Sequence, residues 1–257
     1  MPGFLRNESS LKARGGFEAV NFSRVQHRDS GHWNSNVVSI WLDSTPVVGN
    51  LLVACAFHRS EMATAPSISG SGWSQRIWRA TGMGANNDRR GLVISTKVAG
   101  SSEPTFIEYE WISGGISARM TVQEFSADKA FAWQFLAAGS GDSGTGATGS
   151  GSHQMNGTTD SPVGPFAVGN ASPGGQSLFR FGYLAGRCYD TAVPGASFAA
   201  ADGTVLEAAG QSFQTSWATA FKRDDTGGST LNETAAWTNA QLQTSVGALI
   251  FGGAGAS

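Results

Sequence analysis

Short apolar runs alternate along this chain with clusters of Gly, Ser, Asn and Pro, and this alternation limits the folds open to it. The clearest run, FIEYEW at residues 106–111, places three apolar side chains on one face of an extended strand and two glutamates on the other. Clusters such as GMGANN at 82–87 are typical of turns. Because no stretch has an amphipathic helical pattern with caps, we predict an all-β chain of antiparallel sheets.

The composition excludes several other classes of protein. Of 257 residues, 35 are Gly, and 17 basic side chains face 19 acidic ones. A disordered chain would carry more charge and fewer large apolar groups than the 8 Trp and 15 Phe present here. The glycines have no three-residue period, which excludes collagen, and their number disfavours long helices. A formal net charge of −2 gives no overall basic field, so we expect no nucleic-acid partner.

Three landmarks in the first half recur in the second half at nearly one offset. The segment 43–46 (DSTP) matches 170–173 (NASP) at an offset of 127. The segment 122–125 matches 248–251, and Trp111 matches Trp237, both at an offset of 126. These matches predict a tandem duplication of one unit.

Each unit is long enough for seven or eight short strands, which fits an antiparallel β-sandwich of jelly-roll or immunoglobulin-like type. We therefore expect an extended N-terminal arm at 1–35, sandwiches at 36–136 and 156–257, and a Gly/Ser-rich linker at 137–155. Six tryptophans lie in or beside strands, and we assign most of them to the two cores; they are Trp41, Trp73, Trp78, Trp111, Trp217 and Trp237.

The N-terminal segment concentrates positive charge. Residues 1–28 have a net charge of +3 and no sustained period of 2 or 3.6 residues, which favours an extended arm. We expect the arm to contact a partner through its basic side chains, which are Arg6, Lys12, Arg14, Arg24 and Arg28.

The termini and cysteines bear on the compartment. The first twenty residues contain no apolar run of signal-peptide length, and no stretch of about 18 apolar residues occurs anywhere, so we expect synthesis in the cytoplasm and no membrane partner. Cys55 and Cys188 each lie in an apolar run and are interpreted as buried free thiols.

Two short motifs match catalytic or cofactor signatures without their structural context. GDSG at 141–144 copies the surroundings of a serine nucleophile, but the only upstream histidine in a strand-like run, His58, lacks the expected neighbours. GSGDSG at 139–144 fits a dinucleotide fingerprint, but it neither follows a βαβ strand nor opens a helix. We expect no cofactor.

Two clusters of titratable side chains remain. Glu108, Glu110 and Glu124 could form the carboxylate pair of a glycan hydrolase, although Glu108 and Glu110 fit a solvent-facing strand better. His27 and His32, with Asp29 between them, lack a third ligand at zinc spacing. We therefore expect neither catalysis nor a metal.

Four motifs along the first unit resemble a series found in bacteriophage virion proteins. They are GNLLVA at 49–54, GW at 72–73, KVAGSSEP at 97–104 and YEW at 109–111. The resemblance covers residues 36–128 well and 160–251 in outline, because the second copy lacks the GW turn and has KRDDTGGS in place of KVAGSSEP. It implies a structural component of a phage particle and assigns no catalytic residue.

Among particle components, the resemblance favours a head decoration (cement) protein on the virion surface. It implies the major capsid protein and further copies of the chain as partners, with a homotrimer as the expected assembly. The alternative is a tail, baseplate or fibre protein that binds a host glycan through exposed aromatic side chains, for which Trp33, Trp78 and Trp133 are candidates. A β-sandwich glycan hydrolase is a lesser alternative.

Overall fold

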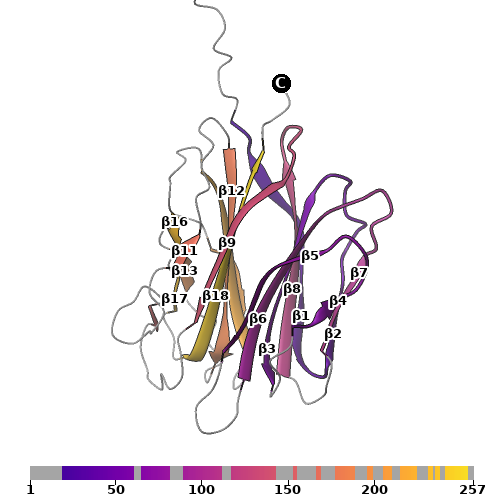
Figure 1. The fold of residues 1–257 in the computed structure, drawn as a ribbon. Coiled ribbons are helices and arrows are strands. Elements are labelled where there is room, and N and C mark those ends of the chain that lie inside the picture. Colours follow the sequence, from indigo (N-terminus) through magenta and orange to yellow (C-terminus); the bar gives the residue numbers. More distant parts are fainter. Residues whose placement is uncertain are drawn as a thin grey trace, which may run out of the picture.

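The computed structural model describes thirteen segments of the chain. They are residues 19–60, 65–81, 89–111, 117–142, 153–154, 166–168, 177–188, 196–198, 205–209, 215–224, 231–233, 235–237 and 241–253. Across these segments the chain forms antiparallel strands and no helix, so none of them contains a helix that could cross a membrane (Figure 1). The prediction of an all-β antiparallel fold is confirmed for this part of the chain.

Two large sheets contain most of the strands. The first has the order β1-β8-β3-β6-β5, and the second has the order β14-β15-β12-β18-β9. The strands of the first sheet are β1 (Phe22–Asn34), β3 (Leu51–Ser60), β5 (Ser74–Thr81), β6 (Arg89–Val98) and β8 (Ser117–Ala127). Those of the second are β9 (Gln134–Asp142), β12 (Ser177–Cys188), β14 (Val205–Ala209), β15 (Thr215–Asp224) and β18 (Gln241–Gly253).

The two large sheets have the same strand order. When the strands of each sheet are numbered from one to five along the chain, both sheets read 1-5-2-4-3 from one edge to the other. β3 thus corresponds to β12, β8 to β18 and β6 to β15, and the start of β3 at Leu51 and that of β12 at Ser177 are 126 residues apart. This repeated order agrees with the offset of the sequence landmarks.

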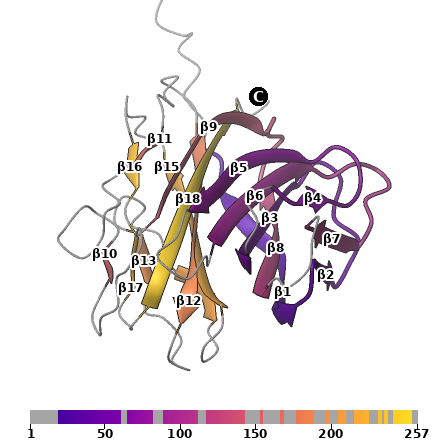
Figure 2. The ribbon, with the colours of Figure 1, turned by 60° about the horizontal axis from the view of Figure 1, so that its bottom comes forward.

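Small sheets flank the large ones on the outside. β2 (Val37–Trp41), β7 (Phe106–Glu110) and β4 (Ser67–Ile68) form a three-stranded sheet, called here the first small sheet. On the opposite side of the molecule lie the short strands of the second half (Figures 1 and 2). They are β10 (His153–Gln154), β11 (Phe166–Val168), β13 (Ala196–Phe198), β16 (Leu231–Glu233) and β17 (Ala235–Trp237).

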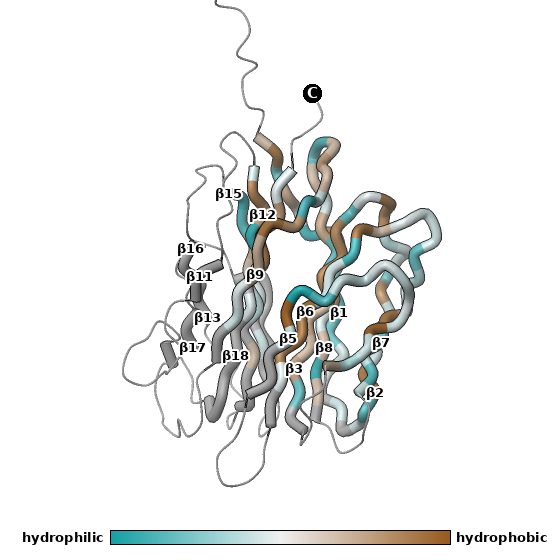
Figure 3. Tube along the Cα trace, viewed as in Figure 1, coloured by the Kyte–Doolittle hydropathy of each residue, from teal (hydrophilic) through white to brown (hydrophobic). Residues whose placement is uncertain are grey.

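The larger hydrophobic core lies between the two large sheets and is shared by both halves of the chain. Hydrophobic residues, brown in Figure 3, occur in strands of both sheets. The first sheet contributes Leu51, Val53, Cys55, Phe57, Ile77, Leu92, Ile94 and Phe125, and the second contributes Phe179, Phe181, Tyr183, Ala185, Trp217, Leu249 and Phe251. Cys55 is a buried free thiol, as predicted, and burial raises the pKa of its side chain.

A second core lies between the first large sheet and the first small sheet. Alternate residues of β3 and β8 point to this side, among them Ala54, Ala56 and Met120, and they pack on Ile107 and Tyr109 of β7. The first large sheet is therefore buried on both faces. This explains why β3 reads as a continuous apolar run and not as an alternating one.

The strands that face each other across the shared core follow a two-fold pattern. β3 contacts β12, its counterpart in the second sheet. β6 contacts β18, the counterpart of β8, and β8 contacts β15, the counterpart of β6. At the margin, β5 contacts β9, the counterpart of β1. The central strands of the two halves thus face each other in a two-fold pattern around β3 and β12.

Close approach of the sheets requires a small residue at Gly247 in β18. A Cβ atom at this position would lie 2.7 Å from Ile94 Cδ1 and 2.9 Å from Ile77 Cδ1 of the first sheet. Such distances are shorter than any ordinary packing contact. The glycine therefore allows the aliphatic side chains of β5 and β6 to pack against the backbone of β18.

Part of the predicted arm forms an edge strand. Residues 22–34, within the range 1–35, form β1, which pairs with β8 along its whole length. Register shifts between Arg24 and Gln26 and between Asp29 and His32 interrupt the alternation of side chains, which is why the sequence showed no period of two. Of the predicted contact residues, Arg24 and Arg28 lie in β1, whereas Arg6, Lys12 and Arg14 lie outside the described residues.

Part of the predicted linker is also a strand. Residues 137–142 continue β9, which pairs with β18 from Gln134 to Asp142. Main-chain hydrogen bonds form a sheet edge whatever the side chains are, so Gly and Ser composition alone did not reveal this strand. As domain boundaries, residues 36–136, 137–155 and 156–257 remain a prediction, although the main core spans both halves.

The shared core predicts that damage in one half destabilises the other. Leu249 of β18 is fully buried between the sheets, so Leu249→Ala should lower the free energy of unfolding by about 2–5 kcal/mol. Urea denaturation should remain a single transition, and hydrogen exchange should show weaker amide protection in β3 of the first half. The half-exposed Val25 offers a control, because Val25→Ala should change stability by less than about 0.5 kcal/mol. Unchanged protection of β3 in Leu249→Ala would contradict a shared core.

Candidate functional site

The outer face of the first small sheet carries an exposed tryptophan, paired with a partly buried phenylalanine, beside two carboxylates. In β2 and β7 alternate residues point outward, and the Cα register places Trp41 opposite Phe106. Trp41 is 68% exposed, and its ring centroid lies 4.9 Å from that of Phe106. Glu108 and Glu110 follow Phe106 on the same face of β7. We call these four residues the acidic aromatic face.

The carboxylates of this face have no cationic partner within the described part of the chain. Ser39 lies opposite Glu108, and Val37 and Ser67 lie opposite Glu110 on the two sides of β7, so no residue of either neighbouring strand neutralises them. The backbone of Glu108 is held by Ser69, whose Oγ accepts a hydrogen bond from Glu108 N at 2.9 Å. The face therefore combines a large exposed π-surface with two negative charges on a fixed sheet.

Glu124 lies in a different environment from Glu108 and Glu110 and does not form a pair with them on this face. It is fully buried, and its carboxylate accepts hydrogen bonds from Val47 N at 2.8 Å, Asn50 Nδ2 at 2.6 Å and Gln26 Nε2 at 2.5 Å. These bonds fasten the loop that precedes β3 to β8. A carboxylate that is saturated in this way holds backbone in place and has no room for a substrate.

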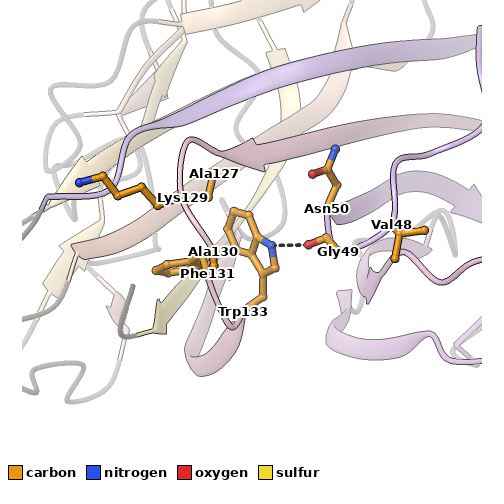
Figure 4. Close-up of a pocket in the computed structure, with 8 residues that line it drawn as sticks. All are labelled: Val48, Gly49, Asn50, Ala127, Lys129, Ala130, Phe131 and Trp133. Carbon is orange, nitrogen blue, oxygen red and sulfur yellow. Dashed lines mark hydrogen bonds between the residues drawn. The ribbon is translucent and has the colours of Figure 1, made fainter. Parts of the chain in front are cut away.

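The loop that Glu124 holds presents two exposed valines beside a shallow pocket. Val47 and Val48 are 57% and 64% exposed, although the backbone beneath them is fixed. The pocket has a volume of about 220 Å³ (Figure 4). Its lining consists of Val48, Gly49, Asn50, Ala127, Lys129, Ala130, Phe131 and Trp133. Trp133 Nε1 donates to Gly49 O at 2.9 Å and ties the segment before β9 to this loop.

His27 and Asp29, which were considered as metal ligands, contact different partners. Asp29 accepts hydrogen bonds from Arg119, with which it forms an ion pair, and the ring of His27 packs against Trp217 with centroids 5.4 Å apart. The side chain of His32 is outside the described set. Across the described residues, no group of three His, Cys, Asp or Glu side chains could hold a metal ion.

His58 is part of an aromatic cluster beneath the first small sheet. It is fully buried, its ring stacks on Trp78 at 5.4 Å between centroids, and Trp111 lies at 5.1 Å. A Cβ at Gly91 would lie 2.0 Å from His58 Nε2, so only glycine fits beside the imidazole. Burial lowers the pKa of His58 to about 3.

The motif residues behind the resemblance make structural contacts with one another. Gly72, at φ +83°, packs against the stem of Lys97, whose Nζ forms an ion pair with Glu103 at 2.6 Å. Tyr109 donates its hydroxyl hydrogen to Ala54 O at 3.1 Å and so joins the YEW and GNLLVA motifs across the second core.

The most exposed tryptophan among the described residues is Trp41, which is not one of the three predicted to be exposed. Trp33 is 42% exposed, whereas Trp78 stacks on His58 and Trp133 packs among phenylalanines. Trp41, one of the six tryptophans most of which were assigned to the cores, lies at the end of β2, on the opposite face of the strand from the buried Ile40. The signal was available in the alternation of VVSIW at 37–41. Trp111 and Trp217 are fully buried, as expected of core residues.

The comparisons with known proteins leave the family of the chain open. No family model matches it, and no curated protein or solved structure shows significant similarity to it.

Buried histidines predict a loss of stability in mild acid. Burial lowers the pKa of His58 to about 3, and burial with the charge of Arg24 lowers that of His27 to about 4, whereas an unfolded histidine titrates near 6.5. The unfolded state therefore binds more protons below pH 6.5, so stability is full above this pH and falls as the pH decreases. Between pH 7.5 and pH 5 the contribution of His58 is about 2 kcal/mol.

The measurement is urea denaturation of the wild type and of His58→Gln at pH 7.5, 6.5, 5.5 and 5. The variant should show a shallower dependence of unfolding free energy on pH, whatever its stability at pH 7.5. An unchanged dependence would show that unfolding does not increase proton binding at His58.

Proposed function

We propose that this chain is a non-enzymatic structural protein of a bacteriophage particle, and specifically a decoration (cement) protein on the head. In this proposal the chain consists of two tandem β-sandwich units of jelly-roll or immunoglobulin-like type. The repeated strand order of the two large sheets supports the duplication.

The observation that carries the proposal is the structural use of the virion-like motifs. Residues from four separate segments meet in or beside the first large sheet, through the contact of Gly72 with Lys97, the Lys97–Glu103 ion pair and the Tyr109–Ala54 hydrogen bond. Motifs that are required for packing are expected to recur wherever the same fold has a structural role. No reactive group depends on these motifs. The resemblance therefore favours a particle component over an enzyme.

The surface of the described residues supports a role in assembly. The chain carries few charges, and its exposed large hydrophobic side chains include Trp41, Val47 and Val48, which are 57–68% exposed. Neighbouring exposed apolar side chains on fixed backbone are typical of surfaces that contact other proteins. We propose the major capsid protein and further copies of this chain, arranged as a homotrimer, as the partners.

The N-terminal segment before Ala19 is proposed as the part that reaches neighbouring subunits. Its basic residues are Arg6, Lys12 and Arg14. Arg28 forms an ion pair with Asp43 of the same chain, so the contact with neighbours is assigned to the residues before β1.

Particle attachment tests the decoration role. A chain without residues 1–18 keeps all of β1, so it should fold with unchanged stability but bind purified heads at least tenfold more weakly. Quantitative gel analysis of particles should find hundreds of copies of the full chain per head. Between three and twelve copies would instead place the protein in the tail or baseplate and contradict the decoration role.

A glycan-binding tail or fibre protein is the second candidate, favoured by the exposure of Trp41. An exposed tryptophan on a flat sheet can stack on the apolar face of a sugar ring, and the neighbouring carboxylates can accept hydrogen bonds from its hydroxyls.

Binding to purified host-surface polysaccharide distinguishes this candidate. Under the glycan hypothesis, Trp41→Ala should weaken binding at least tenfold in isothermal titration, while Val25→Ala, at a half-exposed aliphatic residue of β1, serves as the control. No binding by the wild type would exclude this role for the polysaccharide tested.

A further inference from the structure

We propose that the core between the two large sheets contains a closed hydration site, in which at least two ordered water molecules bridge side chains of both halves. The site lies among inward-facing polar residues of β1, β8, β12 and β15. The inference goes beyond the proposed function and does not depend on it, because it concerns the inside of the folded chain.

Polar side chains from both sheets meet on the side of the shared core where β8 contacts β15. Alternate residues of β8 turn toward this core, as Phe125 does, and the hydrogen bond from Gln123 to Thr219 crosses it. Apart from one residue of β1, every member of the group is at most 7% exposed. We call the group the polar centre, and it consists of Asp29 of β1, Arg119, Thr121 and Gln123 of β8, Tyr183 of β12, and Trp217 and Thr219 of β15.

Four side-chain atoms of the polar centre have no hydrogen-bond partner among the described residues. They are Thr121 Oγ1, Gln123 Oε1, Tyr183 OH and Trp217 Nε1. Each atom belongs to a residue that is at most 1% exposed, so bulk water does not reach it. A buried polar atom without a partner is costly, and folded proteins contain few of them. Four such atoms in one region therefore indicate partners inside the core.

The surroundings of Tyr183 place its hydroxyl near that of Thr121. Burial raises the pKa of Tyr183 well above its usual value, and the neighbouring Cys55 and Asp29 raise it further. Cys55 and Asp29 are the residues that lie opposite Thr121 in the two strands that flank β8. The two hydroxyls thus share neighbours but do not bond to each other. A water molecule between them would satisfy both.

Trp217 and Gln123 provide a second bridge. The ring of His27, which lies opposite Gln123 in β1, packs against Trp217 with centroids 5.4 Å apart. The Nε2 atom of Gln123 already donates to Thr219 Oγ1 at 3.0 Å, so its Oε1 atom needs a donor. The indole N–H can only donate and an amide oxygen can only accept. A water molecule that accepts from Trp217 and donates to Gln123 satisfies both groups.

The chemistry of the polar centre favours water over other occupants. Its two charged members, Asp29 and Arg119, form an ion pair with each other, so a further ion would bring an uncompensated charge into the core. The atoms that need partners are neutral hydroxyl, amide and indole groups, and apolar residues of both sheets surround them. Buried waters in folded proteins bind groups of this kind, with about three hydrogen bonds each.

The closed position of the site links water exchange to motion of the sheets. Because the groups that hold the waters are buried from both sides, a bound water leaves only when β8 and β15 separate locally. The waters should therefore stay bound far longer than water on the surface. Their exchange rate would report how often the two halves of the chain separate.

The test is to detect water in the wild-type protein by two independent measurements. In ¹⁵N-labelled protein, the indole N–H of Trp217 should show water cross-peaks of opposite sign in NOE and ROE spectra, which identify a long-lived bound water. The Trp217→Phe variant assigns this signal. A crystal structure at atomic resolution should show one water within about 3.2 Å of both Tyr183 OH and Thr121 Oγ1, and another between Trp217 and Gln123.

Two buried tyrosines offer a matched pair of variants. Tyr183→Phe removes a hydroxyl that holds a proposed water, whereas Tyr109→Phe removes one that already donates to Ala54 O at 3.1 Å. The first water should be absent from crystals of Tyr183→Phe and present in those of Tyr109→Phe. If Thr121 shares this water, the double variant Thr121→Val/Tyr183→Phe should shift the urea midpoint by less than the sum of the two single shifts.

Four outcomes would overturn the inference, and the first two need only the wild type. One is a crystal structure in which either proposed bridge is dry, with direct hydrogen bonds between the side chains. Another is an occupant other than water, such as an ion or an organic molecule. The third is loss of the first water in Tyr109→Phe as well as in Tyr183→Phe, and the fourth is additive shifts of the urea midpoint.

Discussion

Face-to-face packing of the two large sheets is the interaction on which the rest of the structure depends. Each sheet buries one face of its strands only because the other half of the chain covers it. Phe125 of the first sheet lies 4.9 Å from Phe179 of the second between ring centroids, and Gly247 brings the backbone of β18 against Ile94. Removal of this apolar surface from water is the largest favourable term in such a fold, and here it exists only when both halves are present. The two halves therefore depend on each other, although each forms its own five-stranded sheet.

Apolar packing alone does not fix how two sheets are aligned, because it has no direction. Polar contacts inside the shared core supply this direction. Gln123 Nε2 donates to Thr219 Oγ1 at 3.0 Å and connects β8 to β15 across the core. On the side of β1, Arg119 is nearly buried and is paired with Asp29, which fastens the edge strand to β8. A shift of one sheet against the other would break the Gln123–Thr219 bond and leave both buried groups without this partner, which is costly. The observed alignment of the two sheets is thus favoured over shifted alignments by a few directional bonds.

Sequence analysis predicted the strand content, because strands leave local signals, and the repeated strand order of the two large sheets agrees with the predicted duplication. The run at 106–111 alternates as a half-buried strand should, and its Tyr109 and Trp111 are buried as expected. The shared core could not be predicted from the sequence. The apolar character of Phe125 and Phe251 indicates that they are buried, but it does not indicate which sheet covers them. Edge strands were missed for a related reason. The strands β1 and β9 form mainly through backbone hydrogen bonds, and their bulges or small side chains hide the period of two. Trp41 was not singled out as exposed because tryptophan is usually buried, whereas its position in the alternation of β2 indicated the outer face.

The two-fold arrangement of the halves also limits how copies of the chain can assemble. In a symmetric dimer the self-complementary face is free to pair, but here the two halves of one chain already occupy that face. The faces that pack between the two large sheets are therefore not available to a further copy of the chain. The outer strand β7 of the first half carries two carboxylates beside an exposed tryptophan, whereas the segment that corresponds to it, NETAAW at 232–237, carries one. Among the described residues, an exposed tryptophan beside two carboxylates is thus found on the outer strands of the first half.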